Sequence, residues 1–93
     1  MNRESTLKKL HATFLSETNI RCKPIDRGVA YGGWFELLFQ SLDCEEMEEI
    51  ARFLRKHFSQ PNLFSHCLPK IVSCREGVSL LFQDKEVFRV FNK

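Results

Sequence analysis

The glycine-rich stretch 26–34, DRGVAYGGW, is the first place where this chain could bind a phosphate. A phosphate loop needs Gly-x4-Gly-Lys-Ser/Thr before a helix, and a dinucleotide loop needs Gly-x-Gly-x-x-Gly between a strand and a helix. The spacing of Gly28, Gly32 and Gly33 matches neither motif. We therefore predict a turn between two strands, in which glycine permits a positive φ.

A cluster of cations and aromatic rings over residues 21–34 is the second candidate site. Such a cluster can bind single-stranded nucleic acid, with the cations on phosphates and the rings stacked on unpaired bases. Its members are Arg21, Lys23, Arg27, Tyr31 and Trp34. Lysine and arginine on an edge strand also deter aggregation, and that explanation needs no ligand. Because the net charge is only +2, we favour the explanation without a ligand.

Histidine and cysteine are the remaining residue types that could bind a metal or act as a nucleophile. Zinc sites usually pair their ligands at Cys-x2–4-Cys or His-x3–5-His spacing. The candidates, none of which form such a pair, are His57, His66, Cys67 and Cys74. A Cys–His dyad could join Cys67 or Cys74 to His11 or His57, but no flanking motif supports it. We predict no metal, no cofactor and no catalytic residue, and therefore not an enzyme.

Carboxylates at 45–49 form an acidic cluster that could meet a basic partner. They are Glu45, Glu46, Glu48 and Glu49. Negative side chains at the start of a helix also complement its dipole, and that explanation is sufficient. We favour it.

The composition indicates one globular domain over residues 1–93. Of the 93 residues, 43% are hydrophobic and 28% are charged, which is ordinary for a folded domain. Nine phenylalanines accompany one tyrosine and one tryptophan. Because phenylalanine has no polar tip, it belongs in a core or a dry interface. A core this small leads us to expect some of the nine in contact with a partner.

The N-terminal residues and the cysteines indicate a soluble, cytoplasmic protein without a membrane segment. Charges interrupt the first twenty residues, and no apolar run of 18 residues occurs. The four cysteines are expected to be free thiols, because a reducing compartment disfavours disulfides.

Hydrophobic periodicity predicts the elements of the first two thirds of the chain. Residues 5–17 and 44–58 place apolar side chains at helical spacing, and 20–25 alternates as a strand that Pro24 confines to an edge. Residues 34–42 fit a helix or a strand. The capping box formed by Asp43 and Glu46 starts a helix there, so we predict that 34–42 is a strand.

The C-terminal third alternates in three segments separated by short turns, which predicts three antiparallel strands. The segments are 70–74, 78–83 and 86–91. The predicted order is α-β-β-α-β-β-β. This is an α+β fold, with two helices packed on a mostly antiparallel five-stranded sheet.

Large apolar residues on both faces of the predicted strands favour a protein-interaction or regulatory module. Two helices cover one face, so the other face needs a protein partner or a second copy, with a homodimer as one form. The predicted aromatic anchors are Tyr31, Trp34, Phe64 and Phe91. The alternative is a nucleic-acid-binding regulator that uses the cluster over residues 21–34.

Overall fold

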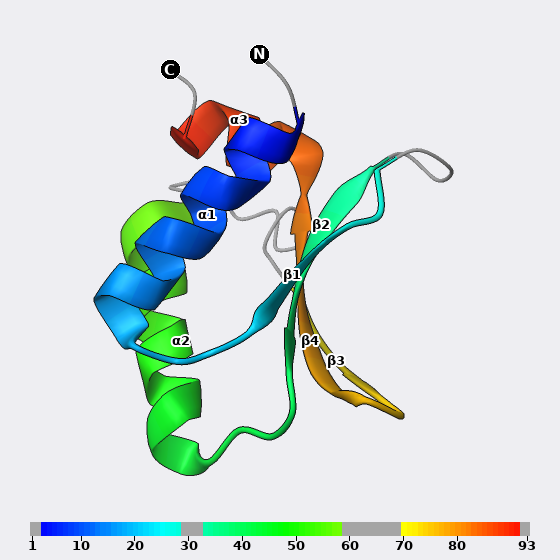
Figure 1. Ribbon diagram of the computed structural model, residues 1–93. Helices are drawn as coiled ribbons and strands as arrows, with labels where there is room; N and C mark the ends of the chain where they lie inside the picture. The colour runs from blue at the N-terminus through cyan, green and yellow to red at the C-terminus, as the bar shows by residue number, and fades with distance from the viewer. Residues whose placement is uncertain (1–2, 29–32, 59–69, 92–93) are drawn as a thin grey trace.

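The computed structural model describes residues 3–28, 33–58 and 70–91, which form an α+β fold of three helices and four strands (Figure 1). The elements, in chain order, are α1 (Arg3–Thr18), β1 (Lys23–Asp26), β2 (Trp34–Phe39), α2 (Cys44–Phe58), β3 (Lys70–Cys74), β4 (Gly77–Gln83) and α3 (Asp84–Phe91). The observed order is therefore α-β-β-α-β-β-α.

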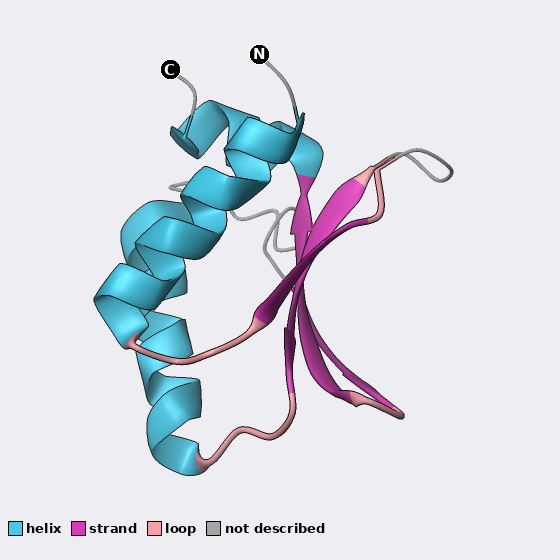
Figure 2. Cartoon of the chain, viewed as in Figure 1, coloured by secondary structure: helices cyan, strands magenta, loops and turns pink. Residues whose placement is uncertain are grey.

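The four strands form one antiparallel sheet in the order β1-β2-β4-β3. A tight turn at Arg75 and Glu76 joins β3 to β4. Strand β2 pairs with β1 on one side and with β4 on the other. Figure 2 shows that the described helices lie on one side of this sheet. The tip of the β3–β4 hairpin projects away from them.

The register assigns each strand residue to one of two faces, because cross-strand partners point to the same side. The inner face, toward the helices, carries Phe35, Leu37 and Phe39 of β2, all buried, together with Leu80 and Phe82 of β4. The outer face is the opposite side. It carries Lys23, Ile25, Trp34, Glu36, Leu38, Lys70, Val72, Cys74, Ser79, Leu81 and Gln83.

The core between the helices and the inner face is built largely from phenylalanine. Phe14 of α1 contacts Phe39 and Phe53 with ring centroids 5.6 and 5.0 Å apart. Among the described residues, six phenylalanines are buried, namely Phe14, Phe35, Phe39, Phe53, Phe58 and Phe82. Much of the phenylalanine content therefore lies inside the domain, and the expectation that some of the nine contact a partner stays a prediction.

Helix α2 has the predicted bounds, and the capping box that predicted its start is present. The Asp43 carboxylate accepts from the Glu46 N–H at 2.8 Å, and Glu46 accepts from the Asp43 N–H at 3.0 Å. Phe53 is buried, whereas Met47 is 38% exposed.

The prediction of a fifth strand at 86–91 is wrong, because this segment belongs to α3. Val87, Val90 and Phe91 lie at i, i+3 and i+4, so a helix turns all three toward one side. Val87 is fully buried and the other two pack against the core. In the predicted strand, by contrast, Val90 would point to the opposite face from Val87 and Phe91.

Polar contacts tie both ends of α1 to the rest of the domain. Near its start, Arg3 donates to Asp26 of β1 at 2.7 Å and lies over the Phe35 ring. Near its end, Glu17 accepts from Lys56 and forms a 2.8 Å contact with His57. Burial by itself raises the pKa of Glu17, but these two partners outweigh it and lower that pKa.

Candidate functional site

Strand β3 forms an exposed edge of the sheet. All five of its residues are exposed, with Ile71 at 42% and Val72 at 43%. Ile71 lies in register with Leu80 and Leu37, which are fully buried on the same face. The helical layer therefore protects the neighbouring strands and leaves β3 uncovered.

The hydrogen-bond pattern of the sheet determines which backbone groups of β3 are available. The Arg27 N–H donates to the Trp34 carbonyl at 3.0 Å, so this is a hydrogen-bonded pair of the β1–β2 ladder. Such pairs alternate along antiparallel strands, and the registers carry the alternation from β2 through β4 to β3. The β3 residues directed to β4 are Lys70, Val72 and Cys74, and those directed away from the sheet are Ile71 and Ser73.

A polar cluster around Glu36 lies at the centre of the outer face. Glu36 accepts from the Trp34 indole at 3.0 Å and from the Ser79 hydroxyl at 3.4 Å. Arg27 forms an ion pair with the same carboxylate at 3.4 Å. The side chain of Glu36 is only 14% exposed. These contacts explain how a carboxylate is accommodated between apolar neighbours on the sheet.

Half-buried apolar side chains surround that cluster on the outer face. Ile25 lies in register with Glu36 on one side, and Leu81 lies in register with it on the other. Leu38 occupies the next row, in register with Ser79 and through it with Val72 of the exposed edge. The outer face thus has a polar centre with apolar neighbours, and Val72 extends the apolar area onto β3.

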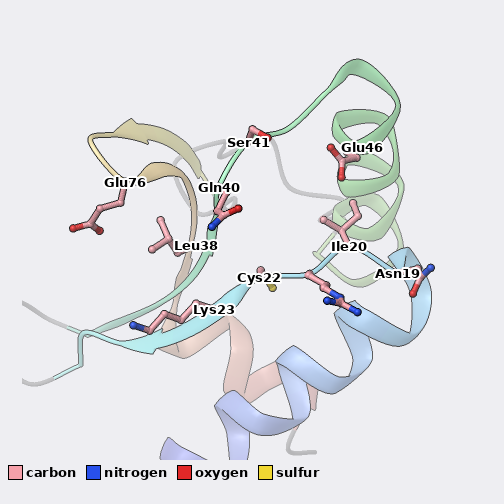
Figure 3. Close-up of a pocket in the computed structure, with 10 residues that line it drawn as sticks. Asn19, Ile20, Cys22, Lys23, Leu38, Gln40, Ser41, Glu46 and Glu76 are labelled. Carbon is pink, nitrogen blue, oxygen red and sulfur yellow. The ribbon is translucent and has the colours of Figure 1, made fainter.

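A groove of about 770 Å³ lies at the end of the sheet where β1 begins and β2 ends (Figure 3). It is formed by the segment between α1 and β1, the end of β2, the start of α2 and the β3–β4 turn. Its lining residues are Asn19, Ile20, Arg21, Cys22, Lys23, Leu38, Gln40, Ser41, Glu46 and Glu76. Burial raises the pKa of the Cys22 thiol to about 11, which keeps it a thiol at neutral pH.

The structure divides the predicted basic–aromatic cluster between two places. Arg21 and Lys23 line the groove, where Glu46 and Glu76 balance their charge. Arg27 and Trp34 instead bind Glu36 on the outer face. Tyr31, predicted to join both groups, lies outside the described residues.

Two of the predicted aromatic anchors lie in described parts of the chain. Trp34 is half-buried on the outer face. Phe91 is half-buried and packs against His57 and Phe58, with ring centroids 5.7 and 6.1 Å away. Phe64, like Tyr31, lies outside the described residues.

Those residues considered for metal binding or catalysis that the structure describes are dispersed. Over residues 3–28, 33–58 and 70–91, no group of three histidine, cysteine or acidic side chains could hold a metal ion. Cys74 has the Ser79 hydroxyl as a neighbour, at 4.0 Å, while His57 contacts Glu17. Cys22, Cys44 and Cys74 are free thiols. His66 and Cys67 lie outside the described residues.

None of the helices in the described ranges has the length and apolar character needed to cross a membrane. No protein-family model, no curated protein and no solved structure matches the chain.

The exposed edge and Glu36 are the features that sequence reasoning missed. A signal for the edge was present: the strand KIVSC contains no proline and only one charge, at its first residue. Glu36 stood as the single charge in the run WFELLF. An isolated charge in a strand buried on one side marks the opposite face, and here that face carries the polar cluster.

Proposed function

We propose that this chain is a small, non-enzymatic, cytoplasmic protein-interaction or regulatory module that acts through the uncovered side of its sheet. The interacting surface consists of strand β3 and the adjoining outer face. The observation that carries the proposal is the exposure of every residue of β3, including Ile71 and Val72. An edge strand of this kind is a ready template for pairing with another chain.

The composition of the outer face also supports a protein partner. Protein interfaces combine a largely apolar centre with well-placed polar groups, and aromatic residues contribute strongly to their binding energy. Here Trp34 is held in a fixed orientation by its hydrogen bond to Glu36. Ile25, Leu38 and Leu81 supply apolar area without further ordering, since each is already half-buried in the sheet.

Affinity capture with a matched pair of bait variants tests this function. Val72→Lys places a charge on the exposed edge, and Met47→Lys places the same charge at a similarly exposed position on α2. We expect a protein retained by the wild-type chain and by Met47→Lys to be lost with Val72→Lys. Circular dichroism of both variants checks that each is folded.

Equal retention of every captured protein by the two variants contradicts the proposal. In that case the edge takes no part in binding. Loss with Met47→Lys alone moves the interacting surface to the helical side of the domain. Either result separates the surface proposed here from an interaction elsewhere on the chain.

A second candidate function is nucleic-acid binding through Arg21 and Lys23. The observation in its favour is that both cations line one groove and that neither is in an ion pair with a described residue. Binding of single-stranded DNA through these two phosphate contacts should weaken only modestly with salt, since each contact adds about 0.7 to the salt slope. Glu46 and Glu76 in the same groove make this candidate the weaker one.

A shift assay with labelled single-stranded DNA at low salt tests the second candidate. Binding that disappears in Arg21→Glu/Lys23→Glu supports it, and no shift at any protein concentration removes it. The variant leaves β3 unchanged, so the capture experiment provides its control.

A further inference from the structure

We propose that the partner of strand β3 is β3 of a second copy of the chain, paired antiparallel about a two-fold axis at Val72. This inference rests on the proposed function, since it identifies the partner of the same surface. The paired strands join the two sheets into one. The two helical layers then lie on one side of the combined sheet, and the two outer faces lie on the other.

The backbone of β3 offers donors and acceptors in the arrangement that such pairing needs. Ile71 and Ser73 direct their N–H and C=O groups away from the sheet, as the alternation from the Arg27–Trp34 pair requires. In the described part of the chain, β4 is the only strand that pairs with β3. No other described strand therefore pairs with these outward groups.

The alternation selects one register for pairing between two copies. Hydrogen-bonded pairs require outward-directed groups on both strands, and β3 has these at positions 71 and 73. Placing Ile71 opposite Ser73 of the second copy satisfies both positions, and the two-fold axis repeats the arrangement. Val72 then faces Val72 of the second copy in a non-hydrogen-bonded pair, where side chains approach most closely, with Cα atoms about 4.5 Å apart.

The side chains are compatible with this register. Val72 is the most exposed large hydrophobic residue described, at 43%, and the pairing covers it with an identical β-branched side chain. Lys70 is the single charge on β3 and lies opposite Cys74 of the second copy. No pair of like charges meets along the strand.

A second copy fits this edge better than an unstructured peptide does. Both strands of a β3–β3 pair are already ordered by pairing with β4. A flexible peptide would lose conformational freedom on binding, which weakens its affinity. The two-fold arrangement is also closed, because it uses both β3 edges and leaves β1 at each end of the combined sheet.

Sedimentation velocity over a wide range of concentrations tests the inference on the full chain. We expect the wild-type chain to form a dimer that dissociates on dilution. Val72→Lys places two ammonium groups opposite each other at the axis and should weaken the dimer by about tenfold or more. Ser73→Pro removes an outward N–H without removing a bond to β4, and should weaken the dimer similarly. Met47→Lys is the control and should dimerise like the wild type.

A disulfide measurement tests the register. In a background with Cys44→Ser, Cys67→Ser and Cys74→Ser, we expect Val72→Cys to form an intermolecular disulfide under mild oxidation. Ile71→Cys in the same background should cross-link much less, since it faces Ser73 of the second copy. Cross-linking that is equal at the two positions, or stronger at 71, overturns the register.

The outcomes separate this inference from the proposed function. A wild-type chain that stays monomeric at every concentration, or a dimer unaffected by both Val72→Lys and Ser73→Pro, overturns the pairing of two copies. If Val72→Lys nevertheless loses a different protein in the capture experiment, the proposed function stands with another partner. If capture is also unchanged, both fail.

Discussion

The two edge strands of the sheet, β1 and β3, present different chemistry to their surroundings. On β1 the outward-directed positions are Pro24 and Asp26. Pro24 has no N–H to offer, and the Asp26 carboxylate is bound by Arg3 of α1 and by the Gly28 N–H at 2.8 Å. On β3 the corresponding positions are Ile71 and Ser73, and the Ile71 side chain is 42% exposed.

Natural sheets usually protect both edges, since an unprotected edge pairs with other chains. This domain protects β1 with a proline and an adjacent helix, whereas β3 has two exposed β-branched side chains and pairs with no described strand besides β4. The difference supports the proposal that β3, and not β1, pairs with another chain. A binding site at β3 explains why one edge of the sheet is protected and the other is not, whereas a general lack of edge protection would affect both.

A glycine lies beside each edge, and replacing them should give the largest contrast. Gly77, where β4 leaves the turn, has φ +142°, and an added Cβ would lie 2.0 Å from the Phe39 carbonyl oxygen. Gly77→Ala should therefore lower the free energy of unfolding by about 3 kcal/mol or more, through backbone strain and overlap with rigid backbone. Urea denaturation, followed by Trp34 fluorescence, measures the free energy of unfolding of the variant and of the wild type.

Gly28→Ala is the matched control beside β1. The three atoms nearest to an added Cβ there belong to the end of the Arg3 side chain, which can move. We expect a loss of about 1 kcal/mol or less. Equal losses from the two substitutions would show that the β3–β4 hairpin does not depend on the close approach of Gly77 to β2.

Amide hydrogen exchange tests the backbone directions on which the comparison depends. In dilute solution the Val72 amide, bonded to β4, should exchange about tenfold or more slowly than its neighbours Ile71 and Ser73, a difference of about 1.4 kcal/mol. Raising the concentration should slow exchange at 71 and 73 if β3 pairs with a second copy. Fast exchange at Val72 with protection at 71 and 73 in dilute solution would reverse the assigned directions.

The sequence predicted best what is determined locally. The capping box of Asp43 and Glu46 is a contact between residues three apart, and it gave both the start of α2 and the strand before it. The failure at 86–91 has a physical cause. Its alternation fits a strand and its spacing of Val87, Val90 and Phe91 fits a helix, and the choice depends on Phe58 and His57, which are distant in sequence.

The candidate site could be predicted only in part. A strand at 70–74 was predicted, but its position at the edge follows from the pairing of β2 with β4 across the whole of α2. The same long-range pairing brings Arg27 and Ser79 to Glu36. The prediction of a basic–aromatic cluster did not include Glu36, because spacing along one strand does not reveal neighbours on the adjacent strands.

Protonation of Asp26 tests the protection of β1 with a smaller expected effect. Hydrogen bonds from Arg3 lower the pKa of Asp26 below its ordinary value of 3.8, outweighing burial. The carboxylate therefore stabilises the fold above that value, and this contribution is lost as the pH falls through the folded-state pKa. Both side chains are about one-third exposed, so Asp26→Asn should cost about 1 kcal/mol or less at pH 7.

The measurement for Asp26 is the difference in unfolding free energy between wild type and Asp26→Asn as a function of pH. It should stay constant from pH 7 to pH 5 and disappear in strong acid. Glu4→Gln is the control, since Glu4 and Lys8 form a highly exposed pair whose removal should have no measurable effect. A difference for Asp26→Asn that grows toward low pH would contradict the assigned role of Arg3.

Pro24→Val tests whether proline closes the β1 edge, and it should have the smallest effect on stability. The substitution restores an N–H at an outward-directed position without disturbing the bonds to β2, so unfolding free energy should change by about 0.5 kcal/mol or less.

Association should change more than stability, because both edges of the sheet then accept strands. Two accepting edges permit head-to-tail contacts, which do not close. Sedimentation at high concentration should therefore show species larger than a dimer, and these should disappear when Val72→Lys is added. A Pro24→Val variant that associates no further than the wild type would show that α1 and the Arg3–Asp26 contact are enough to protect β1, and that the proline is not what distinguishes the two edges.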